Sequence, residues 1–215
     1  PISYRLTIND AIVGLAAFGT SLAVLTTGTP YIVQGLHPDQ MAMERVEVNL
    51  PCLAKRGVVD MGYAAVYPST DGLVQIGPSG AQLVSGQLWT PEQWRAMQPG
   101  SFRAAQLGGR YAFSYIPAGE TTRRLGFVDL SGAQPFVLPV DDAAFTDLHF
   151  NLATGRLCGL VAGGTDIVSF DDDDGDLDTY AWRSKPFQMI HDVSFGAAMI
   201  DAIAPEAGNV PTFAL

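Results

Sequence analysis

Residues 109–115 read Gly-Arg-Tyr-Ala-Phe-Ser-Tyr, a glycine followed by a run rich in apolar and aromatic side chains. Three other stretches open in the same way on a glycine, and each continues through a polar turn into a second apolar run: residues 19–25, 62–67 and 155–161. The opening glycines are 43, 47 and 46 residues apart. A period of about 45 residues is typical of one four-stranded blade of a β-propeller.

This repeat predicts an all-β protein made of propeller-like stacked blades, each with four strands. One four-stranded sheet cannot bury both of its faces alone, so such sheets stack on one another. The continuous apolar runs suit strands that are covered on both faces. The 23 glycines and 14 prolines, with only 16% charged residues, are also typical of a strand-and-turn protein.

The spacing predicts about four blades in this chain. We expect residues 1–10 to be the outer strand of a preceding blade, residues 11–182 to form the blades, and residues 183–215 to begin a following β module. The strands expected in the first blade span residues 12–18, 22–26, 31–34 and 44–48. Because the sequence opens on Pro1 inside a blade pattern and ends in a strand-like run, we expect it to be part of a longer protein.

A short helical insert is expected at residues 89–99, where the strand pattern breaks. Thr90 suits the N-cap, Pro91 the first helical position, and Gln93 completes a capping box. Trp94 and Met97 are three residues apart and share one face of such a helix. The insert is either a packed connector between blades or a protruding contact for a partner.

The formal net charge of −10 argues against a protein that grips nucleic-acid phosphates, which requires clustered basic residues. It still permits a negatively charged wall along which DNA passes. The two local basic pairs, Lys55-Arg56 and Arg123-Arg124, are interpreted as solvated turns.

No membrane span and no disulfide are expected. The apolar stretch of residues 11–33 is interrupted by three glycines and a proline, which indicates strands and turns. Cys52 and Cys158 both fall near apolar segments, so we expect two free, buried thiols of a protein made in a reducing cytoplasm.

Candidate catalytic and metal-binding patterns are incomplete in this sequence. The acidic run at 171–178 lacks the first ligand of a calcium loop, because Phe170 stands at that position, so a solvated hairpin tip is expected. His37, His149 and His191 have no companion at metal-ligand spacing. We therefore expect no catalytic residue, no metal site and no cofactor, and predict that the protein is not an enzyme.

Several segments carry a resemblance to a known family. Residues 33–45, with Val-Gln-Gly before Pro-Asp-Gln-Met-Ala-Met, are similar to a stretch of large virion structural proteins of tailed bacteriophages. Residues 50–60, residues 67–73 and the passage at 180–187, which contains Trp-Arg-Ser-Lys, resemble the same proteins. The resemblance implies a propeller-bearing tail protein, similar to the tail nozzle or hub of short-tailed phages, which assembles as a ring around the DNA exit channel.

We therefore expect a structural subunit of the virion tail, made in the cytoplasm of the bacterial host. Its expected partners are other copies of itself, neighbouring tail or head–tail connector proteins, and DNA that passes without sequence-specific binding. The residues expected at interfaces lie outside the blade pattern: Trp89, Trp94, Met97, Leu36, His37, Met41 and Met43. The alternative is a carbohydrate-binding or carbohydrate-active propeller that uses tyrosine, tryptophan and aspartate side chains on one face.

Overall fold

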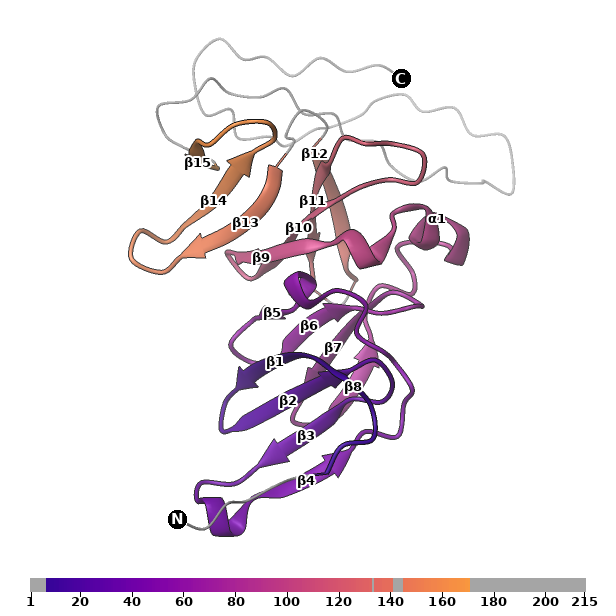
Figure 1. The fold of residues 1–215 in the computed structure, drawn as a ribbon, viewed down its shortest axis with the longest axis vertical. Helices are drawn as coiled ribbons and strands as arrows, with labels where there is room; N and C mark the ends of the chain where they lie inside the picture. The colour runs from indigo at the N-terminus through magenta and orange to yellow at the C-terminus, as the bar shows by residue number, and fades with distance from the viewer. Residues whose placement is uncertain (1–6, 133, 141–144, 171–215) are drawn as a thin grey trace, which may run out of the picture. The chain divides into compact units, whose positions relative to one another are not determined.

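Four consecutive antiparallel sheets make up the described part of the chain in the computed structural model (Figure 1). The structure describes residues 7–132, 134–140 and 145–170, which belong to one compact unit of residues 1–175. The first sheet contains β1 (Ile12–Phe18), β2 (Ser21–Thr26), β3 (Tyr31–Gln34) and β4 (Ala42–Arg45). The second contains β5 (Val59–Asp60), β6 (Ala65–Pro68), β7 (Leu73–Gly77) and β8 (Gly80–Leu83).

The other two sheets repeat this plan. The third contains β9 (Arg103–Leu107), β10 (Arg110–Tyr115), β11 (Arg124–Asp129) and β12 (Phe136–Val140). The fourth has three strands in the described part of the chain: β13 (Phe145–Asn151), β14 (Arg156–Val161) and β15 (Ile167–Ser169). Short 3-10 turns lie between strands at η1 (Pro38–Gln40), η2 (Lys55–Gly57) and η3 (Pro99–Ser101).

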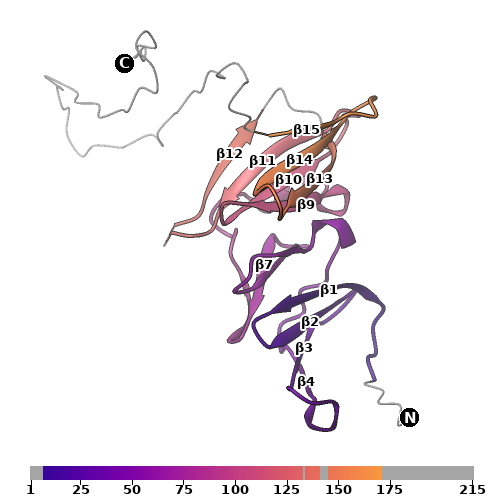
Figure 2. The ribbon, with the colours of Figure 1, turned by 90° about the vertical axis from the view of Figure 1, so that its left-hand side faces the viewer.

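The strands of every sheet follow one another in chain order, which is the meander of a propeller blade. The first strand of each sheet contacts the first strand of the next, from β1 to β5, β9 and β13. Figure 2 shows the sheets following one another in chain order, with β7 of the second sheet between β1 and β9. The predicted all-β fold of stacked, propeller-like blades is confirmed. Each predicted opening glycine lies in or beside the turn that connects the first two strands of its sheet.

Alternating side chains place the core in layers between successive sheets. In β6, Val66 packs between the second and third sheets, whereas its neighbour Tyr67 packs between the first and second. In β10, Phe113 faces the second sheet and Ala112 the fourth. Because successive side chains of a strand point to opposite faces, a strand that is apolar throughout is buried on both sides.

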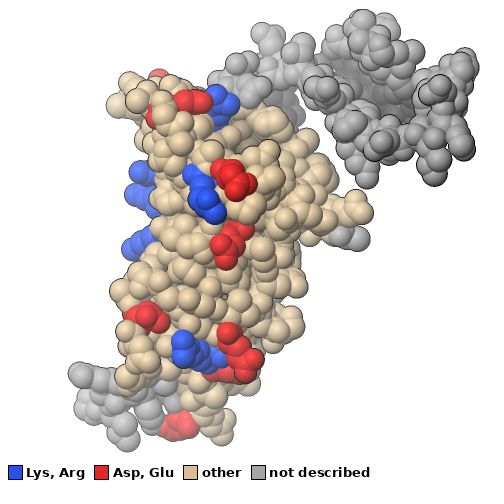
Figure 3. All heavy atoms as spheres, turned by 90° about the vertical axis from the view of Figure 1, so that its right-hand side faces the viewer, with Lys and Arg blue, Asp and Glu red and all other residues tan. Residues whose placement is uncertain are grey.

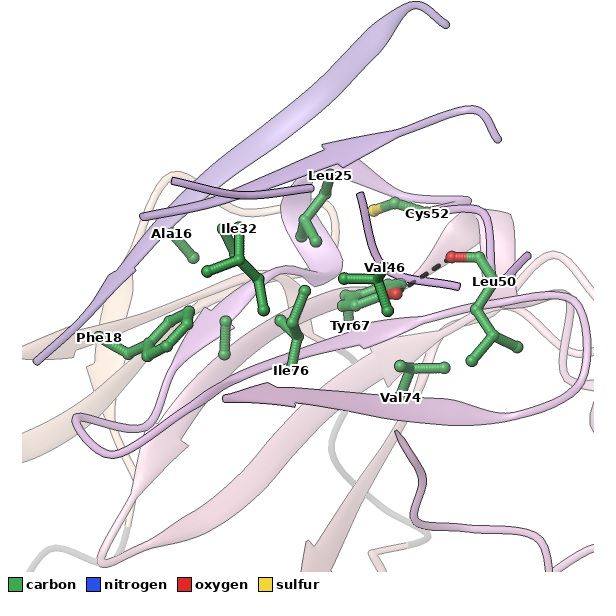
Figure 4. Close-up of a cluster of buried hydrophobic side chains, with 12 residues drawn as sticks. Ala16, Phe18, Leu25, Ile32, Val46, Leu50, Cys52, Tyr67, Val74 and Ile76 are labelled. Carbon is green, nitrogen blue, oxygen red and sulfur yellow. Dashed lines mark hydrogen bonds between the residues drawn. The ribbon is translucent and has the colours of Figure 1, made fainter. Parts of the chain in front are cut away.

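The layer between the first two sheets shows how the connections are held (Figure 4). Phe18, Leu25 and Ile32 from the first sheet meet Tyr67 and side chains of β7 from the second. The Tyr67 hydroxyl donates a hydrogen bond to the Leu50 carbonyl at 3.0 Å. This bond satisfies a buried backbone carbonyl in the segment that links the two sheets.

The predicted helix is present as α1 (Pro91–Ala96). The Thr90 hydroxyl accepts from the Gln93 N–H at 3.3 Å, and the Gln93 side chain accepts from the Thr90 N–H at 2.9 Å. Both bonds of the capping box therefore form, as the sequence predicts.

One strand boundary was predicted wrongly. The fourth strand of the first sheet spans Ala42–Arg45 rather than residues 44–48. The pairing of β4 with β3 ends at this point because the segment before β3 bends at residues 27–29. The Pro30 carbonyl accepts the last hydrogen bond, from the Val46 N–H. The outer strand expected in residues 1–10, the fourth blade beyond residue 170 and the β module expected at 183–215 lie wholly or mainly outside the described residues.

Candidate functional site

The hairpin loop between β3 and β4 is the most exposed apolar segment among the predicted interface residues. Leu36 is 89% exposed and Met41 is 47% exposed. The loop has a defined conformation, because η1 forms its tip and the Asp39 N–H donates to His37 Nδ1 at 3.3 Å. Gly35 has a φ of +146°, and a Cβ there would lie 2.9 Å from the Gln40 carbonyl oxygen. Only glycine fits this close approach.

We name this segment, residues 35–41, the hairpin loop. It adjoins β4, which is the edge strand of the first sheet among the described residues. Exposed apolar side chains next to an unpaired strand edge form a surface that another chain can cover. The geometry provides a docking surface and brings no reactive groups together.

The structure divides the predicted interface residues into two sets. Leu36, His37 and Met41 are exposed on the hairpin loop, as expected for contact residues. Met43 is half-buried on β4 and packs against the outer side of the first sheet, beside Val24, Tyr31 and Val33.

The structure places Trp94, one of the predicted interface residues, in the core, and Trp89 and Met97 against it. Trp94 is 1% exposed, and its Nε1–H donates to the Ser69 carbonyl at 2.8 Å. Its ring centroid lies 5.4 Å from that of Phe102 and 5.4 Å from that of Trp89. Met97 and Trp89 are half-buried against the same core layer. The helix is thus a packed connector, which is the other interpretation that the sequence allowed.

The described part of the chain carries charges of nearly balanced sign. It contains 11 of the 22 acidic residues and nine of the 12 basic ones, whereas residues 171–215 hold nine acidic residues and two basic ones. The face drawn in Figure 3 is mostly uncharged, with acidic and basic side chains scattered over it. The acidic run at 171–178, and with it much of the net negative charge, lies outside the described residues.

The interpretation of the two basic pairs as solvated turns is wrong for Arg123. Its Nε donates to Ser114 Oγ at 2.9 Å and one of its terminal nitrogens donates to the Ser101 carbonyl. Burial first, and the nearby Arg103 second, lower the pKa of Arg123. Arg56 is exposed, but it forms an ion pair with Asp147, a residue of β13 far along the chain. Local sequence spacing gives no signal for this long-range contact.

The two thiols differ in their surroundings, although both are free as predicted. Cys52 is buried and its Sγ donates to the Ala54 carbonyl at 3.7 Å. Burial raises the pKa of Cys52 to about 11, against the smaller opposing effect of that hydrogen bond. Cys158 is half-buried, so the prediction that both thiols are buried holds for Cys52 alone. A thiol with a raised pKa is a poor nucleophile.

Titratable side chains do not gather into a reactive group in the described ranges. There, no three His, Cys, Asp or Glu side chains lie close enough together to hold a metal ion. His37 is exposed in the hairpin loop and its Nδ1 lies 3.3 Å from Asp39 Oδ2, while His149 is exposed on β13. His191 lies outside the described residues.

An open groove of about 610 Å³ lies between the second and third sheets. Tyr63, which is 51% exposed, lines it together with three glutamines, Gln75, Gln82 and Gln87. Gln75 and Gln82 are direct cross-strand neighbours on β7 and β8. The groove offers an aromatic surface and planar amides that both donate and accept hydrogen bonds.

Comparison with known proteins adds no further identification. No family model matches the sequence, and a search of the curated proteins finds no significant match. In the part of the chain that the structure describes, no helix is long and apolar enough to cross a membrane. The fold and these surfaces define the class: an all-β protein of propeller-like blades that presents an apolar hairpin loop.

Proposed function

We propose that this chain is a structural subunit of a bacteriophage tail, of the nozzle or hub type, which contacts neighbouring subunits through the hairpin loop. The observation that carries the proposal is the exposure of Leu36 and Met41 on that loop. The same segment carries one of the resemblances to tail proteins, at residues 33–45. Large apolar side chains on a conformationally fixed loop favour an interface, because burying them against a neighbour removes apolar surface from water.

A second resembling segment supports a mechanical role. Residues 50–60 link the first two sheets, and they are held there by hydrogen bonds from Cys52 N–H to the Thr26 carbonyl and from Leu53 N–H to the Pro68 carbonyl. The segment of residues 50–60 therefore ties the first two sheets together. In the proposed tail, stiff blades would line a channel through which DNA passes without sequence-specific binding.

Assembly of the purified chain tests the proposal. We expect rings by electron microscopy and mass photometry, and we expect the double variant Leu36→Asp/Met41→Asp to remain a folded smaller species. The matched control is Leu152→Asp, because Leu152 is 86% exposed in the turn between β13 and β14, away from the hairpin loop. Equal assembly of both variants, or a wild-type monomer at all concentrations, would contradict the proposal. Labelling of intact phage tails with an antibody then tests the location.

A second candidate, carbohydrate binding, is favoured by the groove beside Tyr63. An exposed tyrosine ring near several amide side chains suits the faces and hydroxyl groups of a sugar. A glycan array with the wild type and Tyr63→Ala tests this candidate. Binding that disappears in Tyr63→Ala but persists in Leu36→Asp/Met41→Asp would favour it over the tail proposal.

A further inference from the structure

Three arginines from three different segments converge at one end of the second, third and fourth sheets. Arg56 lies in η2 immediately before β5, Arg103 is the first residue of β9, and Arg123 directly precedes β11. In an antiparallel meander, the start of the first strand and the loop between the second and third strands lie at the same end. Asp147, near the start of β13, meets two of these arginines there.

Both carboxylate oxygens of Asp147 already accept hydrogen bonds or pair with an arginine. Asp147 Oδ2 accepts from Arg103 Nη1 at 3.3 Å and forms the ion pair with Arg56 Nη1. Its other oxygen, Oδ1, accepts from the Leu148 backbone N–H at 3.1 Å. One negative charge therefore faces two positive charges directly.

Arg123 adds a third positive charge and no carboxylate. Its hydrogen bonds go to uncharged acceptors, which are Ser114 Oγ and the carbonyls of Ser101 and Ser114. These bonds fix the plane of the guanidinium without neutralising it. The nearest acidic side chain of the same loop, Glu120, is committed to Arg124 at 2.7 Å.

The group of Arg56, Arg103, Arg123 and Asp147, here named the arginine site, thus has a local excess of positive charge. A guanidinium carries five N–H donors in a planar fork. In the described part of the chain, Nε and Nη2 of Arg103 and Nη1 of Arg123 have no acceptor. Such donors match carboxylate and phosphate oxygens, which accept two parallel hydrogen bonds.

We propose that the arginine site binds a small ligand that carries an oxyanion, either a carboxylate or a phosphate. The ligand oxygens accept from the free donors of Arg103 and Arg123, and Arg56 adds charge at the exposed rim. Asp147 holds Arg103 and Arg56 in place and competes with the ligand for them. The site depends neither on the tail role nor on the groove beside Tyr63, which other residues line.

Binding of small anions to the whole chain tests the site. We expect glucuronate or inorganic phosphate to raise the melting temperature in proportion to its concentration, and to give saturable heat in isothermal titration calorimetry. Glucose is the matched uncharged probe for glucuronate, and sodium chloride at equal ionic strength controls for screening. Comparing the affinities for glucuronate and for inorganic phosphate shows whether the site prefers a carboxylate or a phosphate. No saturable binding in either arm would overturn the proposal.

Substitutions test the geometry. Arg56→Gln and Arg103→Gln should each weaken anion binding about tenfold or more, because each removes charge-assisted hydrogen bonding. Arg124→Gln is the matched control, since Arg124 adjoins Arg123 in sequence but is paired with Glu120. Asp147→Asn should instead tighten binding, because it removes the competing charge. An equal loss of anion affinity in Arg124→Gln and Arg56→Gln would show general charge attraction and overturn the proposed site. The arginine variants provide this test even if Asp147→Asn does not fold.

Discussion

The hydroxyl of Tyr111 in β10 donates a hydrogen bond to the carbonyl of Gly57 in η2, across 2.7 Å. Tyr111 lies in the third sheet and Gly57 in the turn that leads into the second sheet, and the Tyr111 side chain is completely buried. The same arrangement recurs twice, with Tyr67 bonded to the Leu50 carbonyl and Trp94 to the Ser69 carbonyl. Aromatic side chains of the core thus satisfy loop carbonyls that packing between sheets removes from water.

Tyr111→Phe should lower the free energy of unfolding by about 1–3 kcal/mol, because it leaves the Gly57 carbonyl buried without a donor. Urea denaturation monitored by tryptophan fluorescence measures the change. Tyr63→Phe is the control, since the Tyr63 ring is half-exposed and its change should stay within about 0.5 kcal/mol. Equal stability of the two variants would show that the carbonyl finds another donor.

Trp94→Ala should lower the free energy of unfolding by about 3–5 kcal/mol, as expected for removing a fully buried aromatic side chain. The loss includes the bond to the Ser69 carbonyl and the contacts with Trp89 and Phe102. Arg95→Ala, on the exposed side of the same helix, should change stability little. Thermal denaturation measures both changes. A Trp94→Ala protein as stable as the wild type would contradict the core role of Trp94 and favour the predicted interface role.

Local sequence signals predicted the strands and the helix, because they depend on neighbouring residues. The 45-residue period placed the sheets, and Thr90 with Gln93 placed the start of α1. The end of β4 could not be predicted from such local signals, because it depends on where its neighbour β3 stops pairing with it. A strand ends where its partner ends, and alternation within the strand does not encode that point.

The sites were harder to predict than the fold because they depend on contacts between distant segments. Trp94 is flanked by polar and exposed residues, which made it resemble a protruding anchor, but the helix turns it into the core. Arg56 and Asp147 are 91 positions apart and meet only because the first strands of successive sheets are adjacent. The exposed Leu36 and Met41 were found because they interrupt a local strand pattern.

Asp129→Asn should reduce stability at neutral pH and progressively less as the pH falls. Hydrogen bonds from the Ser131 hydroxyl and backbone N–H, and then Arg110, hold the pKa of Asp129 below its usual value. A carboxylate with a lowered folded-state pKa contributes stability above its unfolded pKa of about 4 and loses that contribution as the pH falls through the folded value.

Urea denaturation of the wild type and Asp129→Asn at pH 7, 5 and 3 measures this convergence. Asp71→Asn is the control, because it makes the same change at an exposed carboxylate in the turn between β6 and β7. A constant difference between the wild type and Asp129→Asn at all three values would contradict the role of the Asp129 charge.

The two thiols should react with a disulfide reagent at very different rates in the folded protein. With a pKa of about 11, Cys52 is a thiolate in only about one molecule in a thousand at pH 8, and its side chain is almost fully buried. Cys158 is half-buried on β14 and more accessible. In the Cys158→Ala variant, the remaining Cys52 thiol should therefore react slowly in buffer and rapidly in urea. In the Cys52→Ala variant, the remaining Cys158 thiol should react rapidly under both conditions. Ellman's reagent measures the rates, and equal rates for the two variants would mean that the first core layer opens as readily as the surface of β14.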